Sequence, residues 1–305
     1  NHVSRRNRIV QDAQSAGPDS DAGRMVRWCA GHFDVFEGHS DLVTLNHDNP
    51  AVREHVTRIM NYWCGRGVDG WRLDAAYSVN PEFWAAVLPP VREKYPDVWI
   101  FGEVIHGDYA GIVRASGMDS VTQYELWKGI WSSIESRNFF ELDHALGRHN
   151  KFSDAFTPMT FVGNHDVTRI ASRVGQDGAV LATAILATIG GIPLIYYGDE
   201  LAYRGVKEER FGGDDDIRPV FPASPADLSN LGADTLRAHQ NLLGLRRRHP
   251  WLVDARTEPL DLTNERYVYR TGVPGVEPLI VELDVRNGCS VLIREAGQVV
   301  WSSGA

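Results

Sequence analysis

Between residues 49 and 198, short hydrophobic runs alternate with longer segments in which hydrophobic residues recur every three to four positions. This alternation predicts repeated βα units around a parallel sheet. The runs are nearly continuous, which is typical of parallel strands buried on both faces. We expect five such strands, at residues 68–74, 98–101, 120–124, 159–163 and 193–197.

Two Asn-Pro pairs mark the start of helices within this pattern. Asn49-Pro50 and Asn80-Pro81 each combine an N-cap residue with a proline suited to the first helical position. We expect the first helix to end near Gly65 and the second near Lys94, with an interruption at Pro89-Pro90. Further helical stretches are expected at residues 125–148, 178–189 and 234–248.

The two ends of the chain do not follow this alternation. Residues 3–48 are irregular and rich in Gly, Asp, Ser and His, which indicates a loop or a small subdomain. Short hydrophobic runs at 267–269, 279–283, 290–293 and 298–301 predict a small antiparallel domain. The uncharged stretch 179–197 has the length of a membrane span, but two glycines and Pro193 interrupt it, so a buried helix followed by a buried strand is favoured.

Acidic residues follow three of the expected strands. In Gly70-Trp71-Arg72-Leu73-Asp74, the period of two places Arg72 and Asp74 on the same side of the strand. A guanidinium beside a carboxylate favours its ionised form, which suits a nucleophile, although an ordinary ion pair explains the motif equally well. Glu103 follows four hydrophobic residues and a glycine, an environment that suits a general acid or a carboxylate that caps a loop.

The third acidic position lies in Asn164-His165-Asp166, where Asp166 could also cap a helix. In a βα barrel, the carboxyl ends of all strands face one cleft, so the three carboxylates are expected to converge. Retaining glycoside hydrolysis needs a carboxylate nucleophile and a protonated acid roughly 5 Å apart. Asp74, Glu103 and Asp166 supply these groups and a third negative charge for the transition state.

These motifs, in this order, resemble those of the α-amylase family of retaining glycoside hydrolases. Residues 70–74 are similar to the family's strand-4 nucleophile motif, 102–104 to its strand-5 acid motif, 161–166 to its strand-7 motif, 191–200 to its strand-8 segment and 216–219 to the loop beyond. The resemblance implies that Asp74 is the nucleophile, Glu103 the general acid/base and Asp166 a transition-state stabiliser. It further implies substrate contacts by Arg72, Tyr77, Asn164 and His165.

The family's strand-3 motif ends in Asn-His, and this chain begins with Asn1-His2. The resemblance therefore implies that His2 binds the substrate and that the chain starts at the end of strand 3. We expect an α/β fold: a (β/α)8 TIM barrel of the α-amylase type, incomplete, with strands 4–8, the end of strand 3 and a small antiparallel β domain. The expected parts are 1–48, the end of strand 3 with a short B-domain-like excursion; 49–250, the catalytic barrel; and 251–305, the C-terminal domain. A second polypeptide carrying the missing strands is one way to complete such a barrel.

Two departures from the family pattern affect the expected ligands. Calcium-binding amylases use the strand-3 Asn, a B-domain Asp and a His four residues after the nucleophile, whereas Thr44 and Ser78 stand at the last two positions here. Only Asn1 of these ligands is retained, and calcium requires six or more oxygen ligands, so we expect no calcium at that place. We also expect no other metal site and no cofactor. Tyr77 replaces a Lys that contacts sugar in many amylases, so the reducing-end subsites are expected to differ.

Composition and charge fit a globular enzyme that acts on a neutral substrate. The 305 residues are 43% hydrophobic, and 40 acidic against 31 basic residues give a net charge of −9, which disfavours nucleic acid and anionic membranes as partners. The run Arg246-Arg247-Arg248-His249 is interpreted as a solvated helix end, and His144 and His149 as surface residues. An odd count of three cysteines favours a reducing compartment, so we expect the cytoplasm, although any signal peptide would precede Asn1.

The predicted function is a retaining hydrolase of α-glucosidic bonds in α-glucans or maltooligosaccharides, acting through a covalent glycosyl-enzyme intermediate. Two alternatives remain open. A transglycosylase of the same family, for α-glucan transfer or sugar isomerisation, would use the same residues with a sugar hydroxyl as acceptor. A catalytically inactive carbohydrate-binding fragment would keep the fold without turnover.

Overall fold

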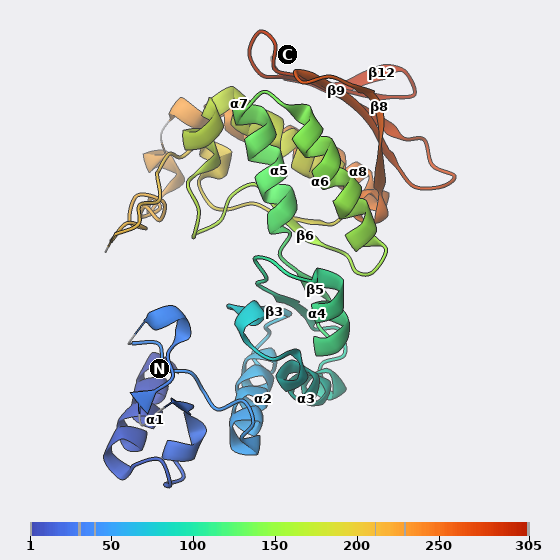
Figure 1. The fold of residues 1–305 in the computed structure, drawn as a ribbon. Helices are drawn as coiled ribbons and strands as arrows, with labels where there is room; N and C mark the ends of the chain where they lie inside the picture. Colours follow the sequence, from blue (N-terminus) through green and yellow to red (C-terminus); the bar gives the residue numbers. More distant parts are fainter. Residues whose placement is uncertain (1, 30–31, 40, 211, 229, 304–305) are drawn as a thin grey trace. The chain divides into compact units, whose positions relative to one another are not determined.

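The computed structural model describes residues 2–29, 32–39, 41–210, 212–228 and 230–303, and only the backbone of residues 2–8 (Figure 1). The chain forms two compact units, and each is described by itself. The first unit is Asn1–Glu103 with Gly111–Asp119, and the second is Val104–Ala110 with Ser120–Ala305.

The first unit begins with a helix that the sequence pattern did not predict. Helix α1 (His2–Ala16) is followed by an antiparallel pair of short strands, β1 (Trp28–Cys29) and β2 (His32–Phe33). Ala13, Val26 and Val43 form a small core here, with Trp28 and Phe33 packed against it. His2 is therefore the first residue of a helix and not the end of a strand, and its side chain lies outside the described part, as does Asn1.

The rest of the first unit follows the predicted βα order. Helix α2 (Pro50–Cys64) leads to strand β3 (Gly70–Leu73), and helix α3 (Pro81–Lys94) leads to strand β4 (Trp99–Gly102), which pairs parallel to β3. Asn49 and Asn80 cap the two helices, each accepting a backbone N–H two residues on.

Helix α3 continues through Pro89 and Pro90, so the interruption predicted there is wrong. Val87, Leu88 and Val91 are completely buried around the two prolines. Their packing stabilises the helix in spite of the missing backbone donors, since tertiary burial routinely outweighs local propensity.

The second unit contains the remaining predicted strands. Strand β5 (Ser120–Val121) precedes two helices, α5 (Tyr124–Glu135) and α6 (Phe139–Ser153), where one helical stretch was expected. Arg137 in the left-handed region (φ 55°) and the N-cap Asn138 separate them. Strand β6 (Met159–Phe161) pairs parallel to β7 (Ile192–Leu194), with α7 (Ile170–Thr188) between them in sequence. Helix α4 (Tyr109–Ser116) has residues in both units.

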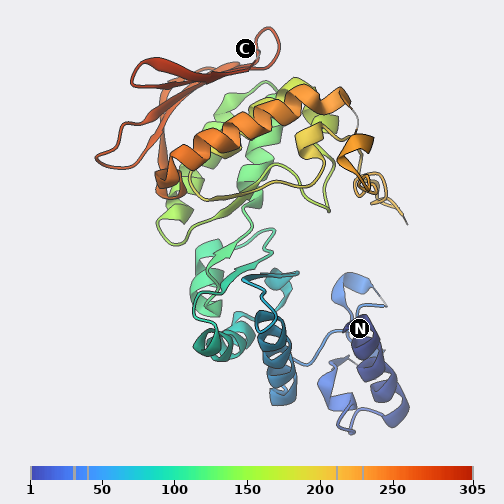
Figure 2. The ribbon, with the colours of Figure 1, turned by 180° about the vertical axis from the view of Figure 1, so that it is seen from behind.

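The C-terminal part is an antiparallel sheet packed on helices (Figures 1 and 2). After helix α8 (Ala233–Arg248), the strands are β8 (Arg256–Leu262), β9 (Arg266–Gly272), β10 (Leu279–Asp284), β11 (Ser290–Glu295) and β12 (Gln298–Ser302), in the spatial order β12-β11-β10-β9-β8. Alternate residues of β10, namely Leu279, Val281 and Leu283, are buried in the core formed with α5–α8. Four of these strands were predicted, and β8 was missed.

Burial corrects two predictions for polar residues of the second unit. His149 is completely buried, contacts the Gly190 carbonyl at 3.2 Å and has its pKa lowered to about 4 by burial, so it is not a surface residue. Arg246 is 9% exposed and donates to the carbonyls of Ala187 (3.1 Å) and Ile189 (2.8 Å), so it binds the end of α7 and is not solvated. Both side chains can be buried because backbone carbonyls of neighbouring elements are their hydrogen-bond partners. The sequence pattern of one helix does not reveal such partners.

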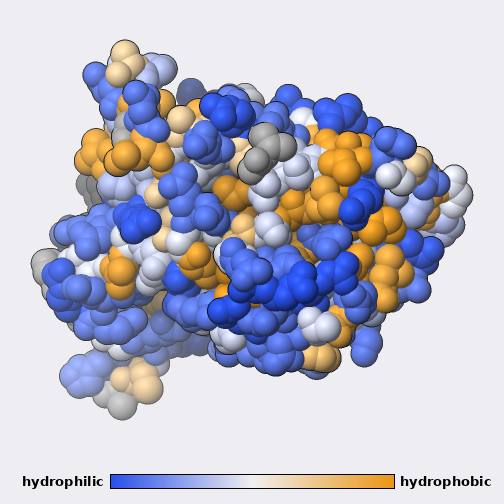
Figure 3. Space-filling model, turned by 90° about the horizontal axis from the view of Figure 1, so that it is seen from above, coloured by the Kyte–Doolittle hydropathy of each residue, from blue (hydrophilic) through white to orange (hydrophobic). Residues whose placement is uncertain are grey.

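The long uncharged stretch forms the C-terminal half of α7 and strand β7, a buried helix followed by a strand as predicted. No helix in the described part of the chain is long and apolar enough to cross a membrane. On the face of the molecule seen in Figure 3, hydrophilic residues surround smaller hydrophobic areas.

Candidate active site

Arg72 and Asp74 lie at the carboxyl end of β3, next to the end of β4. Leu73 of β3 and Gly102 of β4 are paired in the parallel register. Asp74 and Glu103 are the residues that directly follow them, so the two acidic residues start from neighbouring strand ends. Leu73 is buried, whereas the Arg72 Nη1 and Asp74 Oδ1 atoms are 2.6 Å apart on the other side of the strand. The predicted period of two is confirmed here.

One guanidinium joins the two carboxylates that the sequence singled out. Arg72 donates through Nη1 to Asp74 and through Nη2 to Glu103 Oε1 at 2.8 Å. The Glu103 side chain is 8% exposed and that of Asp74 is 81% exposed. The pair therefore consists of one buried and one accessible carboxylate, which suits two different roles in a reaction.

The backbone after Asp74 completes the surroundings of Glu103. Ala75 adopts a left-handed conformation (φ 45°), and its N–H donates to Glu103 Oε2 at 2.9 Å. At Gly102, a Cβ atom would lie 2.9 Å from the Ala76 Cβ and 2.6 Å from the Met118 sulfur. A side chain at this position would clash with Ala76, so the glycine lets the turn that follows Asp74 pack against the end of β4.

Tyr77 contacts a residue that the sequence did not indicate. Its hydroxyl donates to Glu37 Oε1 at 2.7 Å, and its ring centroid is 6.4 Å from that of Phe36. Partial burial and the hydrogen bond to Glu37 raise the pKa of the Tyr77 phenol, which stays protonated as a donor. Residues 36 and 37 thus connect the excursion before α2 to the site.

A cavity of about 400 Å³ in the first unit includes Asp74 in its lining. Thr44 and Ser78, which stand at the calcium-ligand positions of the family pattern, both line it, and Asp74 is the one carboxylate among the described lining residues. Most other lining side chains are apolar, such as Phe36 and Phe83. Two hydroxyls and one carboxylate in a largely apolar wall fall short of the six or more oxygen ligands of calcium, so the described side chains do not fit the ion at this place.

The second unit holds the Asn164-His165-Asp166 motif, directly after β6. Asn164 Oδ1 accepts the Asp166 backbone N–H at 2.8 Å, and Asn164 Nδ2 donates to the Tyr124 hydroxyl at 2.9 Å. His165 Nε2 lies 3.0 Å from Asp166 Oδ2. The motif is therefore a hydrogen-bonded group whose carboxylate is 35% exposed.

Arg218 is the main partner of this motif. It donates through Nη2 to Asp166 Oδ1 at 2.9 Å and to Asp214 at 2.8 Å, and through Nε to the His165 carbonyl at 2.7 Å. The hydrogen bond from Lys207, and then the charge of Arg218, lower the pKa of Asp214. Two cations and two carboxylates thus fix the loop that carries Arg218 against Asp166.

A buried ion pair supports the motif from within. Arg169 is completely buried, contacts Asp199 at 2.9 Å and stacks on the Tyr196 ring at 4.1 Å. Burial raises the pKa of Asp199 to about 6 despite this cation. Gly163 leaves the space that the Asp199 carboxylate occupies, which explains the glycine before Asn164.

The structure thus brings together Arg72, Asp74 and Glu103 in the first unit, and Asn164, His165 and Asp166 in the second. Sequence reasoning missed Glu37 and Arg169, and it included Asp199 only as part of the segment 191–200. It included Arg218 only as part of a loop. The conspicuous Gly/Asp-rich composition of residues 211–218 was a usable signal for Arg218, whereas Glu37 lies in an irregular segment without a pattern.

The fold matches that of solved structures with low sequence identity to this chain. A cyclic alpha-maltosyl-(1→6)-maltose hydrolase from Arthrobacter globiformis gives a TM-score of 0.77 over 90% of this chain and 63% of its own, at 21% identity. An alpha-amylase from H. orenii gives 0.76 over 93% and 69%, at 23% identity. The class of fold is therefore the α-amylase type of barrel with a C-terminal antiparallel sheet.

Residues 28–256 match the model of the alpha amylase catalytic domain, and the chain belongs to this family. Alpha-amylase 3 of Dictyoglomus thermophilum is 34% identical over 188 residues, which cover 56% of this chain and 37% of that protein. A maltogenic alpha-amylase of Bacillus acidopullulyticus is 30% identical over 234 residues (73% and 38%), and a 4-alpha-glucanotransferase of Thermotoga neapolitana is 31% identical over 172 (53% and 37%). The chain spans less than two fifths of the length of these relatives.

Proposed function

We propose that this protein hydrolyses α-glucosidic bonds in α-glucans or maltooligosaccharides with retention of anomeric configuration. Asp74 is the nucleophile, Glu103 the general acid/base, and Asp166 stabilises the transition state. Family membership and the names of the relatives, which include amylases and a glucanotransferase, support the substrate class.

The reaction follows from the different surroundings of the two carboxylates. Glu103 donates a proton to the glycosidic oxygen while Asp74 attacks the anomeric carbon, so the bond to the leaving sugar breaks and a glucosyl ester forms. Glu103 then takes a proton from water, the water oxygen attacks the anomeric carbon, and Asp74 leaves as a carboxylate. Each group ends in its starting state.

The observation that carries this proposal is the Arg72 bridge. A planar guanidinium that binds both carboxylates at 2.6 and 2.8 Å keeps them close together. Retaining enzymes need carboxyl groups about 5–5.5 Å apart, whereas inverting enzymes leave about 6.5–9.5 Å for a water molecule. The bridge keeps the two carboxylates side by side, and the proposed retention rests on the resemblance of their motifs to those of a retaining family.

Substrate binding is assigned to His2, Arg72, Tyr77, Asn164 and His165 as part of the proposal. The hydrogen bonds of Asn164 and His165 with Asp166 support a common role for this motif. The proposed location is the cytoplasm, which three cysteines without disulfide bonds support.

Transfer to a sugar acceptor is the second candidate function. The cavity beside Asp74 favours it, because an apolar wall that includes Phe36 can hold an acceptor sugar and exclude water. Chromatography of the products from maltooligosaccharides separates the two reactions. Only shorter sugars and glucose indicate hydrolysis, and longer or rearranged sugars indicate transfer.

The experiment that tests the assignment replaces Asp74 by Ala. Because Asp74 is 81% exposed, the variant should fold normally and lose all turnover of the α-glucan. Asp97→Ala, which removes an exposed carboxylate before β4, is the matched control and should remain as active as the parent. A folded and active Asp74→Ala variant would refute the assignment, and a parent protein that binds maltooligosaccharides without turnover would support the inactive carbohydrate-binding alternative.

A further inference from the structure

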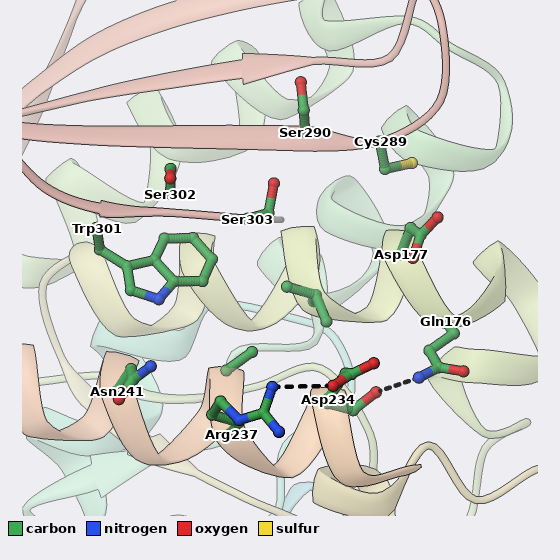
Figure 4. A pocket seen from close by; sticks show the side chains of 13 residues that line it. Gln176, Asp177, Asp234, Arg237, Asn241, Cys289, Ser290, Trp301, Ser302 and Ser303 are labelled. Atoms are coloured by element: carbon green, nitrogen blue, oxygen red, sulfur yellow. Dashed lines mark hydrogen bonds and ion pairs between the residues drawn. The ribbon is translucent and has the colours of Figure 1, made fainter. Parts of the chain in front are cut away.

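The second unit contains a cavity of about 490 Å³ whose walls come from α7, α8 and the strands β11 and β12 (Figure 4). None of its lining residues belongs to the candidate active site. Its volume lies within the range of about 300–1,000 Å³ that is typical of small-molecule sites. Because its walls are helices and strands on one core, the cavity is a fixed feature of this unit.

One wall is polar and belongs to α8. Asp234, Arg237 and Asn241 are spaced three and four residues apart, so they lie on one face of the helix. Arg237 pairs with Asp234 at 3.0 Å. Asn241 is exposed on this face, and its amide can offer both a donor and an acceptor to a ligand.

The opposite side carries an aromatic ring with hydroxyl groups beside it. Trp301 of β12 is half-buried, packs partly on the core and extends its indole ring into the cavity (Figure 4). Its Nε1–H has no hydrogen-bond partner among the residues that the structure describes. Ser290 and Ser302 add hydroxyls from neighbouring strands. An aromatic face with donors and acceptors at its rim matches a sugar ring, which is apolar on its faces and polar at its edge.

The charge of the lining favours a neutral ligand. Asp234 and Arg237 compensate each other, which leaves the exposed carboxylate of Asp177. A phosphate or carboxylate ligand would be repelled by Asp177, whereas a sugar hydroxyl can donate to it.

We propose that this cavity is a second carbohydrate-binding site, separate from the catalytic residues, which holds glucosyl units of an α-glucan against Trp301. The choice of an α-glucan rests on the proposed function, while the lining itself requires only a neutral sugar. The site would anchor a polysaccharide while another part of the chain is cleaved, which raises the local substrate concentration.

The test follows the tryptophan indole N–H signals by nuclear magnetic resonance during a titration with maltotriose. The Asp74→Ala variant of the full chain serves as the background, so the sugar is not consumed. Trp301→Phe identifies the Trp301 signal among the nine tryptophans. We expect this signal to shift saturably, and Asn241→Ala, which keeps the ring and a good helix former, to weaken the apparent affinity at least about threefold.

Trp63→Phe, which changes a partly exposed ring on α2, is the matched control and should leave the titration of Trp301 unchanged. Absence of a shift at Trp301 up to about 50 mM maltotriose would overturn the proposal, because weaker binding has no consequence in solution. An unchanged affinity in Asn241→Ala would also contradict it. If the Trp301 signal does not respond while the parent enzyme still cleaves maltooligosaccharides, only the second site is refuted. If turnover is absent and the signal responds, only the catalytic proposal fails.

Discussion

Replacement of Arg72 by Met tests whether this side chain holds the two carboxylates together. The variant keeps an unbranched side chain near the backbone and removes the hydrogen bonds to Asp74 and Glu103. The contact with Asp74 is exposed and contributes at most about 1 kcal/mol, whereas breaking a buried pair costs about 3–5 kcal/mol. Arg72 is itself 30% exposed and Glu103 retains the Ala75 N–H, so we expect the free energy of unfolding to fall by about 2–4 kcal/mol.

Activity should fall as well, because misplacement of a reacting group by about 1 Å lowers the rate about 100-fold. Urea unfolding measures the first effect, and kcat/KM on maltotriose measures the second. Arg270→Met is the matched control, since Arg270 is 51% exposed and pairs with Glu258 on the surface, and it should change stability by less than about 1 kcal/mol. Equal urea midpoints for the two variants would refute the reasoning about Arg72.

Three further predictions concern single side chains. Because burial lowers the pKa of His149 to about 4, its neutral form stabilises the fold above pH 6.5, and this stabilisation should be lost as the pH falls from 6.5 to 4. His149→Gln should remove that part of the pH dependence in thermal unfolding, and His144→Gln, on the exposed side of α6, should not. Tyr77→Phe loses the hydrogen bond to Glu37 and should raise KM for maltooligosaccharides with little change in kcat; an unchanged KM would show that the bond does not shape the site. Asp166→Asn should lower kcat by about 100-fold or more in a normally folded protein, and near-parental kcat would exclude its role in the transition state.

The βα order of residues 49–198 could be predicted because buried parallel strands leave continuous hydrophobic runs, and the caps Asn49 and Asn80 mark the helices. Strand β8 was missed because it lies at the edge of its sheet, where exposed polar residues and Pro259 are tolerated. Helix α1 was missed because few of its residues are hydrophobic and its core is small. Hydrophobic patterns reveal the helices and strands that pack into a large core. Strand β8 and helix α1 contribute few side chains to such a core.

The candidate site was predictable where its residues end a strand. Arg72, Asp74 and Glu103 follow from position alone, because neighbouring parallel strands place their ends side by side. The partners Glu37 and Arg218 come from irregular segments, where no periodicity determines which side chains meet. For the same reason, the burial of His149 and Arg246 depends on carbonyls of distant residues that the sequence does not connect to them.

In the proposed mechanism, Asp74 forms a covalent bond with the anomeric carbon of the substrate. Incubation of the protein with a fluorinated glucosyl fluoride, which forms the ester quickly and hydrolyses slowly, should trap this intermediate. Mass spectrometry of the digested protein then locates the added sugar. We expect one glucosyl adduct on the peptide that contains Asp74 and none in Asp74→Ala. An adduct on any other carboxylate would show that Asp74 is not the nucleophile.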